Sequence, residues 1–288
     1  MPGATGPIGV FDSGIGGLSV LHALMKALPD EAFVYLADNA HAPYGEKTEA
    51  FVRERSSRLA RYLIETQGIK ALVVACNTAT AAAIEAVREA FPALPVVGIE
   101  PGLKPAAEHT RTGHIGVMAT RGTVQSPRFA RLMERVQNDA HFKVQACDGL
   151  ALAIEQASAP ESHGLDPTQA AARVEELLHR YATALGPWGK EPGQTDTLVL
   201  GCTHYVFAQE ALQRFTGDGV RLLSTGEPVA RQTRRLLEAA QALQAPRPGQ
   251  AQALTAFATG DRAGPQAACR LWLRDMPQAQ GSWHTVQV

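Results

Sequence analysis

The chain of 288 residues carries an approximate internal repeat. One copy opens with Ile-Gly-Val at residues 8–10 and later contains an apolar run that ends in Cys76. The other copy opens with Ile-Gly-Val at residues 115–117 and later contains an apolar run that ends in Cys202. The second copy is longer, in part because it contains the Gly/Pro-rich loop 186–194. The repeat therefore predicts two similar halves.

Short apolar runs rich in β-branched residues alternate with amphipathic helical patterns along the chain, which is typical of α/β proteins. The expected strands are 8–11, 32–37, 71–75, 95–99, 115–118, 144–146, 197–200 and 221–223. Because these runs are not polar at alternate positions, we expect mostly parallel sheets covered by helices on both faces. Helices are expected over 48–66 and 166–185, and Asp166 and Pro167 give the second a strong start signal. Residues 241–250 form an expected linker before a last strand and helix.

Two of the four cysteines stand where a strand is expected to meet a helix. In open α/β sheets, ligands bind at the carboxyl ends of the strands, so Cys76 and Cys202 would each stand on one wall of a cleft if the halves face each other. Each is followed at once by polar residues, Asn77-Thr78 and Thr203-His204. The helix N-termini that follow are expected to favour the thiolate by lowering the pKa of both thiols.

Cys147 and Cys269 lack such polar flanks, and we interpret them as core residues. The four cysteines are widely spaced and contain no CxxC motif, so neither a zinc site nor a disulfide framework is expected. We therefore predict that the protein has no metal site.

Two thiols on opposite faces of one carbon suit racemisation or epimerisation. One thiolate would remove the α-proton while the opposite thiol delivers a proton to the other face. Asp12 and His204 are the expected neighbours of these thiols, and His204 could pair with a thiolate.

The composition excludes several other classes of protein. Hydrophobic residues make up 45% of the chain, charged residues 19%, and the formal net charge is −1. This balance argues against a dedicated nucleic-acid or membrane-surface binder. No apolar run approaches the length of a membrane span, and the first residues do not resemble a signal peptide, so a cytoplasmic protein is expected.

The glycine-rich segment 14–19 partly matches a dinucleotide-binding motif, with Asp38 near the place of a ribose-binding acid. A nucleotide-dependent dehydrogenase is therefore one alternative, but Ser19 replaces the third glycine and Asp12 would face the pyrophosphate. We instead expect a tight loop that brings backbone amides near a small ligand. A two-lobed solute-binding protein is a further alternative. The two thiols and the missing signal peptide argue against it.

Four segments together resemble the glutamate racemases, cofactor-independent isomerases that supply D-glutamate for bacterial peptidoglycan. These segments are DSGIGGLSV at 12–20, PYG at 43–45, ACNTAT at 75–80 and LGCTHY at 200–205. The resemblance covers nearly the whole chain and implies two α/β domains related by a pseudo-twofold axis, with the active site in the cleft between them. The histidine of GCTH favours glutamate, with aspartate or another acidic amino acid as the alternative substrate.

The resemblance also implies the site residues. Its catalytic pair matches Cys76 and Cys202, with Cys76 acting on D-glutamate and Cys202 on L-glutamate. Its substrate-binding residues match Asp12, Ser13, Tyr44, Gly45, Asn77, Thr78, Thr203 and His204, and Thr120, Thr123 and Glu155 fall where further contacts are expected. No cofactor is implied. The expected partner is the small-molecule substrate glutamate, and we expect no binding of nucleic acid or membrane. A homodimer is possible. The expected domains are residues 1–98 with 207–288, and residues 99–206.

Overall fold

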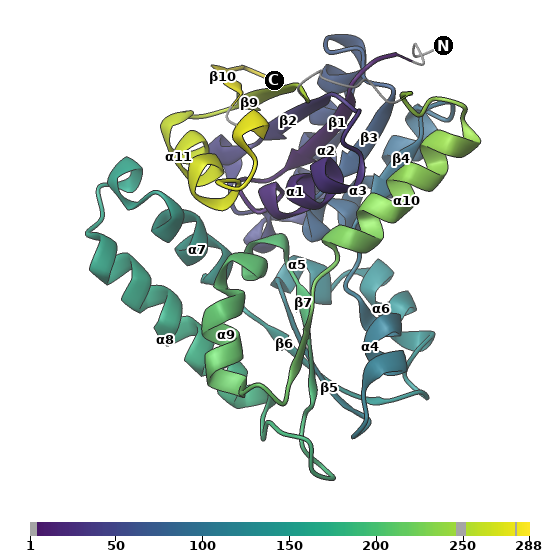
Figure 1. The fold of residues 1–288 in the computed structure, drawn as a ribbon. Coiled ribbons are helices and arrows are strands. Elements are labelled where there is room, and N and C mark those ends of the chain that lie inside the picture. Colours follow the sequence, from purple (N-terminus) through teal and green to yellow (C-terminus); the bar gives the residue numbers. More distant parts are fainter. Residues whose placement is uncertain (1–4, 246–251, 280) are drawn as a thin grey trace.

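The computed structural model describes residues 5–245, 252–279 and 281–288. The strands of that part of the chain form two separate sheets, and all neighbouring strands run parallel (Figure 1). The first sheet has the order β10-β9-β2-β1-β3-β4, and the second has the order β6-β5-β7-β8. The strands are β1 Ile8–Asp12, β2 Phe33–Ala37, β3 Ala71–Val74, β4 Val96–Gly98, β5 His114–Ala119, β6 His141–Ala146, β7 Thr197–Gly201, β8 Arg221–Leu223, β9 Leu254–Ala258 and β10 Ser282–Thr285.

The predicted α/β class is confirmed, and each of the eight predicted strands is present. The end of the chain holds two further strands, β9 and β10, around a helix, where one strand and one helix were expected. The predicted linker 241–250 lies outside the described residues from residue 246 onward.

The internal repeat is visible in the strand order. The order β2-β1-β3-β4 of the first sheet matches the order β6-β5-β7-β8 of the second, so β1 corresponds to β5 and β3 to β7. Cys76 follows β3, and Cys202 follows β7. The two cysteines therefore occupy equivalent positions in the two halves.

Helices cover both faces of each sheet. The α-helices are α1 Leu18–Ala27, α2 Glu49–Glu65, α3 Asn77–Ala90, α4 Leu103–His109, α5 Arg121–Val124, α6 Pro127–Glu134, α7 Leu150–Ser158, α8 Pro167–Leu185, α9 Gln209–Thr216, α10 Gly226–Ala239 and α11 Ala263–Trp272. The 3₁₀ helices are Asn39–His41, Tyr44–Glu46, Pro160–His163, Thr203–Ala208 and Pro277–Ala279. The predicted helices 48–66 and 166–185 correspond to α2 and α8, and the Asp166 carboxylate accepts the N–H groups of Thr168 and Gln169 as a cap.

Successive side chains of each strand enter different cores because a strand alternates its faces. In β1, Val10 packs with α1, α10 and α11, while Phe11 packs with α2 and α3. In β7 of the second sheet, Leu198 packs with α7, α8 and α9, while Val199 packs with α4 and α6. Burial on both faces is why these strands are apolar throughout.

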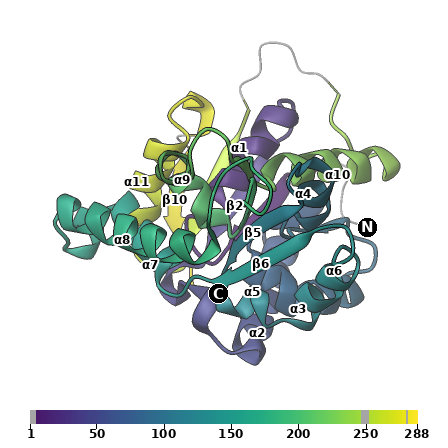
Figure 2. The same ribbon diagram turned by 90° about the horizontal axis from the view of Figure 1, so that it is seen from below.

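The second sheet extends past the boundary predicted at residue 206. β8 pairs with β7 in that sheet, and α9 packs on α8. We therefore propose that the chain returns to the first domain between β8 and α10, which lies against α1 (Figure 1). On this proposal the boundary lies later than residue 206, because α9 and β8 follow β7 in the second half as α3 and β4 follow β3 in the first. Figure 2 shows the second domain, with β5 and β6 in front, from below.

Candidate active site

Cys76 stands at the start of α3, where β3 ends. Its Sγ accepts the N–H of Ala79 at 3.5 Å and lies 3.8 Å from the hydroxyl of Ser13, which follows β1. The thiol is buried, with 6% of the residue exposed. Burial and the nearby Asp12 carboxylate raise the pKa of Cys76 to about 12, although the Ala79 N–H lowers it. The predicted lowering of this pKa is wrong because one helix N–H does not offset the loss of solvent.

Cys202 has a different environment at the equivalent position. The segment that follows it is a 3₁₀ helix rather than the start of an α-helix, and its sulfur caps no N–H group there. Its Sγ instead lies 3.8 Å from His204 Nδ1, and His204 Nε2 lies 2.5 Å from Glu155 Oε2. Burial opposes a charge on His204, but its contacts with Cys202 and Glu155 raise the pKa of the imidazole well above its usual value. A protonated His204 is therefore placed to stabilise a negative charge on Cys202.

Asp12 connects the two halves at the carboxyl end of β1. Its carboxylate accepts the Ser13 hydroxyl and the Gly14 N–H from its own domain, and the Thr203 hydroxyl from the second domain at 3.0 Å. Burial raises the pKa of Asp12, while the facing His204 lowers it. Cys202 also contributes to the raised pKa of Cys76. Asp12, Ser13, Thr203 and His204 are thus brought together from the two halves of the chain.

The glycine-rich loop is explained by close contacts with the second domain rather than by phosphate binding. A side chain at Gly14 would collide with the Glu155 carboxylate, and one at Gly16 would collide with His204. The N–H of Ile15 donates to both oxygens of Glu155 at 3.1 Å. The expected tight loop is present. Its Ile15 amide, however, donates to the carboxylate of Glu155 rather than to a small ligand.

Threonine hydroxyls from both domains contact one another at the start of α3. Thr78 of α3 lies 2.9 Å from Thr120 and 3.5 Å from Thr123 in the second domain, measured between Oγ1 atoms. The Tyr44-Gly45 turn approaches the same place, because a Cβ at Gly45 would lie 2.7 Å from Thr120 Cβ.

Asn77 is buried beside these hydroxyls, with 4% of the residue exposed. Within the described part of the chain, neither its side-chain nitrogen nor its side-chain oxygen has a hydrogen-bond partner. Buried amides are normally paired, so this side chain is suited to bind a polar ligand.

The position of Tyr44 depends on contacts of Asp38 that the sequence did not predict. The Tyr44 hydroxyl donates to Asp38, whose carboxylate also accepts Arg55 Nε at 2.9 Å and Nη2 at 2.8 Å, and the Thr259 hydroxyl at 2.8 Å. Asp38 is fully buried. The acidic residue at the end of β2 could have indicated this cluster, but its partners Arg55 and Thr259 lie 17 and 221 residues away in the sequence.

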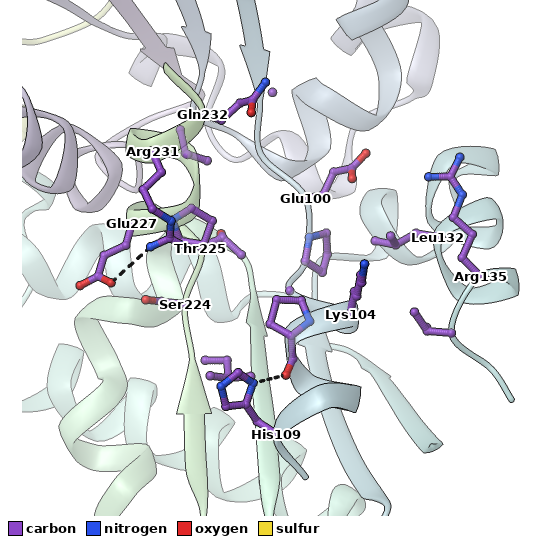
Figure 3. A pocket seen from close by; sticks show the side chains of 18 of the residues that line it. Glu100, Lys104, His109, Leu132, Arg135, Ser224, Thr225, Glu227, Arg231 and Gln232 are labelled. Atoms are coloured by element: carbon purple, nitrogen blue, oxygen red, sulfur yellow. Dashed lines mark hydrogen bonds and ion pairs between the residues drawn. The ribbon is translucent and has the colours of Figure 1, made fainter. Parts of the chain in front are cut away.

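A separate cavity of about 930 Å³ lies where the chain crosses between the domains (Figure 3). Its lining includes Glu100, Lys104 and Arg135 on one side and Glu227 and Arg231 of α10 on the other. None of the predicted site residues is among the described residues that line it.

The described residues contain no cluster of three or more His, Cys, Asp or Glu side chains suited to hold a metal ion. Among the helices of the described part of the chain, none has the length and apolar character needed to cross a membrane. Cys147 and Cys269 are buried, as expected for core residues.

Two parallel-sheet domains with a cysteine at each equivalent strand end define the class of protein. Residues 8–233 match the family model described as Asp/Glu/Hydantoin racemase, and the chain belongs to this family. The relatives and solved structures narrow this class to proteins named glutamate racemase. The resemblance predicted from the four motifs is therefore confirmed.

The glutamate racemase of Ectopseudomonas mendocina is 45% identical over 94% of this chain and 96% of its own length. The crystal structure of glutamate racemase isoform RacE1 from Bacillus anthracis has a TM-score of 0.82 at 29% identity, with 99% of each chain covered. The Escherichia coli glutamate racemase, solved in complex with L-glutamate and the activator UDP-MurNAc-ala, has a TM-score of 0.78 at 35% identity, with 98% of each chain covered.

Proposed function

We propose that this chain interconverts L- and D-glutamate by a two-base mechanism in which Cys76 and Cys202 face opposite sides of the α-carbon. The observation that carries this proposal is the equivalent placement of the two buried thiols at the ends of β3 and β7, in two halves that meet at the hydrogen bond between Thr203 and Asp12. No cofactor is needed, because the two side chains supply both the base and the acid. The glutamate-bound Escherichia coli relative supports the choice of substrate.

In the L-to-D direction, the Cys202 thiolate removes the α-proton of L-glutamate and becomes a thiol. The Cys76 thiol delivers its proton to the opposite face and becomes a thiolate. The raised pKa of Cys76 keeps this group protonated at neutral pH, and His204 Nδ1 lies 3.8 Å from the Cys202 sulfur. The D-to-L direction runs the same transfers in reverse.

The polar groups around Cys76 are suited to hold the substrate. The unpartnered amide of Asn77 and the hydroxyls of Thr78, Thr120 and Thr123 would bind a carboxylate or the amino group of glutamate. Ser13, Thr203 and the Tyr44-Gly45 turn would complete the enclosure. Donors preorganised in this way would also stabilise charge that develops on the substrate carboxylate during proton removal.

The D-glutamate made by this reaction would supply cytoplasmic peptidoglycan synthesis, and through it the cell wall and cell shape. A homodimer would be compatible with the proposal, because each chain carries both thiols.

The function is tested by circular dichroism of L-glutamate and, separately, D-glutamate with purified protein and no added cofactor. We expect the signal of each enantiomer to decay to that of the racemate. The same assay with both enantiomers of aspartate tests the alternative substrate. An unchanged glutamate signal would contradict the proposal. Tight glutamate binding without turnover would favour a binding protein, and activity only with NAD would favour a dehydrogenase.

A further inference from the structure

Trp272 is the last residue of α11 in the first domain, and it contacts the segment that carries His204. Its indole stacks on the ring of Phe207, with 4.5 Å between ring centroids and an angle of 15° between the planes. Phe207 lies on the 3₁₀ helix Thr203–Ala208, three residues after His204. Trp272 therefore supports this short helix from the side of the first domain.

The same indole also contacts the helix that carries Glu155. Trp272 Nε1 donates to Ser158 Oγ at 3.1 Å, and Ser158 is the last residue of α7. The Ser158 hydroxyl donates in turn to the carbonyl of Ile154 at 2.8 Å, one turn back and next to Glu155. Figure 1 shows α11 lying directly beside α7, and the contacts between them agree.

We propose that Trp272 is a positioning residue that holds the His204–Glu155 pair in place. Trp272 contacts both segments that carry the pair, through Phe207 and Ser158, and the 2.5 Å contact between His204 Nε2 and Glu155 Oε2 leaves little tolerance for movement of either segment. The glycine loop also holds the pair, because the Ile15 N–H donates to Glu155. This inference rests on the proposed function, because it assigns Trp272 to the proton transfer at Cys202.

The first test compares Trp272→Leu, which removes both contacts, with Trp272→Phe, which keeps an aromatic ring for Phe207. For Trp272→Leu we expect kcat to fall about tenfold with KM changed by less than about twofold, and for Trp272→Phe a partial recovery of kcat. Trp188→Phe is the matched control, because Trp188 lies in the loop before β7 and donates to Ala182 in the second domain. Thermal unfolding of each variant identifies loss of folded protein. A folded Trp272→Leu protein with unchanged kcat would overturn the proposal.

The second test separates positioning of the pair from a general structural effect. Elimination of chloride from a 3-chloroglutamate needs one base only, so Cys76→Ser reports on Cys202 and Cys202→Ser reports on Cys76. Adding Trp272→Leu should slow the Cys202-dependent elimination about tenfold and the Cys76-dependent elimination less than about twofold. Equal losses in both backgrounds would overturn the positioning role. Full racemisation by either cysteine variant would instead contradict the two-base mechanism, and the kcat comparison above would still decide the role of Trp272.

Discussion

His204 and Glu155 form a buried pair in the second domain, with Nε2 of the imidazole 2.5 Å from Oε2 of the carboxylate. The other imidazole nitrogen lies 3.8 Å from Cys202 Sγ, so the imidazole stands between the carboxylate and the sulfur and contacts both. Because both partners are almost fully buried, little solvent screens their charges. The pair therefore gives Cys202 an environment that Cys76 does not have.

Glu155→Gln tests the effect of this pair on pH dependence. The contacts with Cys202 and Glu155 raise the pKa of His204, so His204 stays charged until the pH rises through that pKa. Without the carboxylate, the pKa falls, and we expect the loss of kcat on the basic side to begin at lower pH, with kcat reduced about tenfold or more at neutral pH. The measurement is the pH profile of kcat. Glu161→Gln in an exposed 3₁₀ helix is the control, and a basic limb unchanged in Glu155→Gln would contradict the assignment.

Gly14→Ala tests the fit between the glycine loop and Glu155. The added methyl would collide with the Glu155 carboxylate, which is the movable end of a side chain. We expect Glu155 to shift away from His204, with racemisation reduced about tenfold or more and stability lowered by about 1–3 kcal/mol because a buried carboxylate loses its partners. Gly102→Ala is the control, because among the described residues its Cβ would meet only Thr225, at 3.6 Å. Wild-type rates in Gly14→Ala, measured by circular dichroism, would contradict the close fit.

Asp12→Asn tests the cause of the raised pKa of Cys76. Burial is the larger cause and the Asp12 carboxylate the next, so removing this charge should lower the pKa from about 12. Only the thiolate reacts with iodoacetamide, so we expect faster alkylation of Cys76 in the variant at pH 8 to 9. Peptide mass spectrometry measures the rate, with Cys269 as the internal control because its raised pKa, about 11, does not depend on Asp12. Unchanged alkylation of Cys76 would rule out this charge effect.

Asp38→Asn tests the support of the Tyr44 turn. Burial opposes the charge on Asp38, but hydrogen bonds from Arg55, Tyr44 and Thr259 hold its pKa below the usual value. A lowered pKa stabilises the fold above the ordinary aspartate pKa of about 4, and this contribution is lost as the pH falls toward the lowered value.

The variant leaves the Arg55 guanidinium buried without its carboxylate, which we expect to cost about 3–5 kcal/mol. Its stability should also depend less on pH between about 3 and 5. Urea unfolding over this range measures both effects, with the exposed helix cap Asp166→Asn as the control. Equal pH dependence in Asp38→Asn and the parent protein would contradict the role of Asp38.

Much of the architecture follows from the sequence because strands buried on both faces are visible as apolar runs. The repeat places Cys76 and Cys202 at equivalent strand ends, and the strand orders of the two sheets agree with this prediction. A polar residue after each cysteine makes a contact between the two halves, Thr78 with Thr120 and Thr203 with Asp12.

The remaining features depend on contacts between distant segments. Asp38 matches a ribose-binding acid by spacing, but its oxygens accept hydrogen bonds from Arg55 and Thr259. The pKa of Cys76 is set by burial, which no local motif specifies. Trp272 is an ordinary amphipathic-helix residue in the sequence, and only the packing of α11 brings it to Phe207.

The central claim, proton transfer between opposite faces of the α-carbon, is tested most directly by isotope incorporation. L-Glutamate is incubated with the protein in D₂O, and the α-deuterium of each enantiomer is measured by mass spectrometry during the first few per cent of conversion. Two bases predict that the D-glutamate formed carries deuterium while the remaining L-glutamate keeps its protium. Deuterium entering L-glutamate as fast as D-glutamate forms, or D-glutamate that retains the original protium, would show that a single base serves both faces.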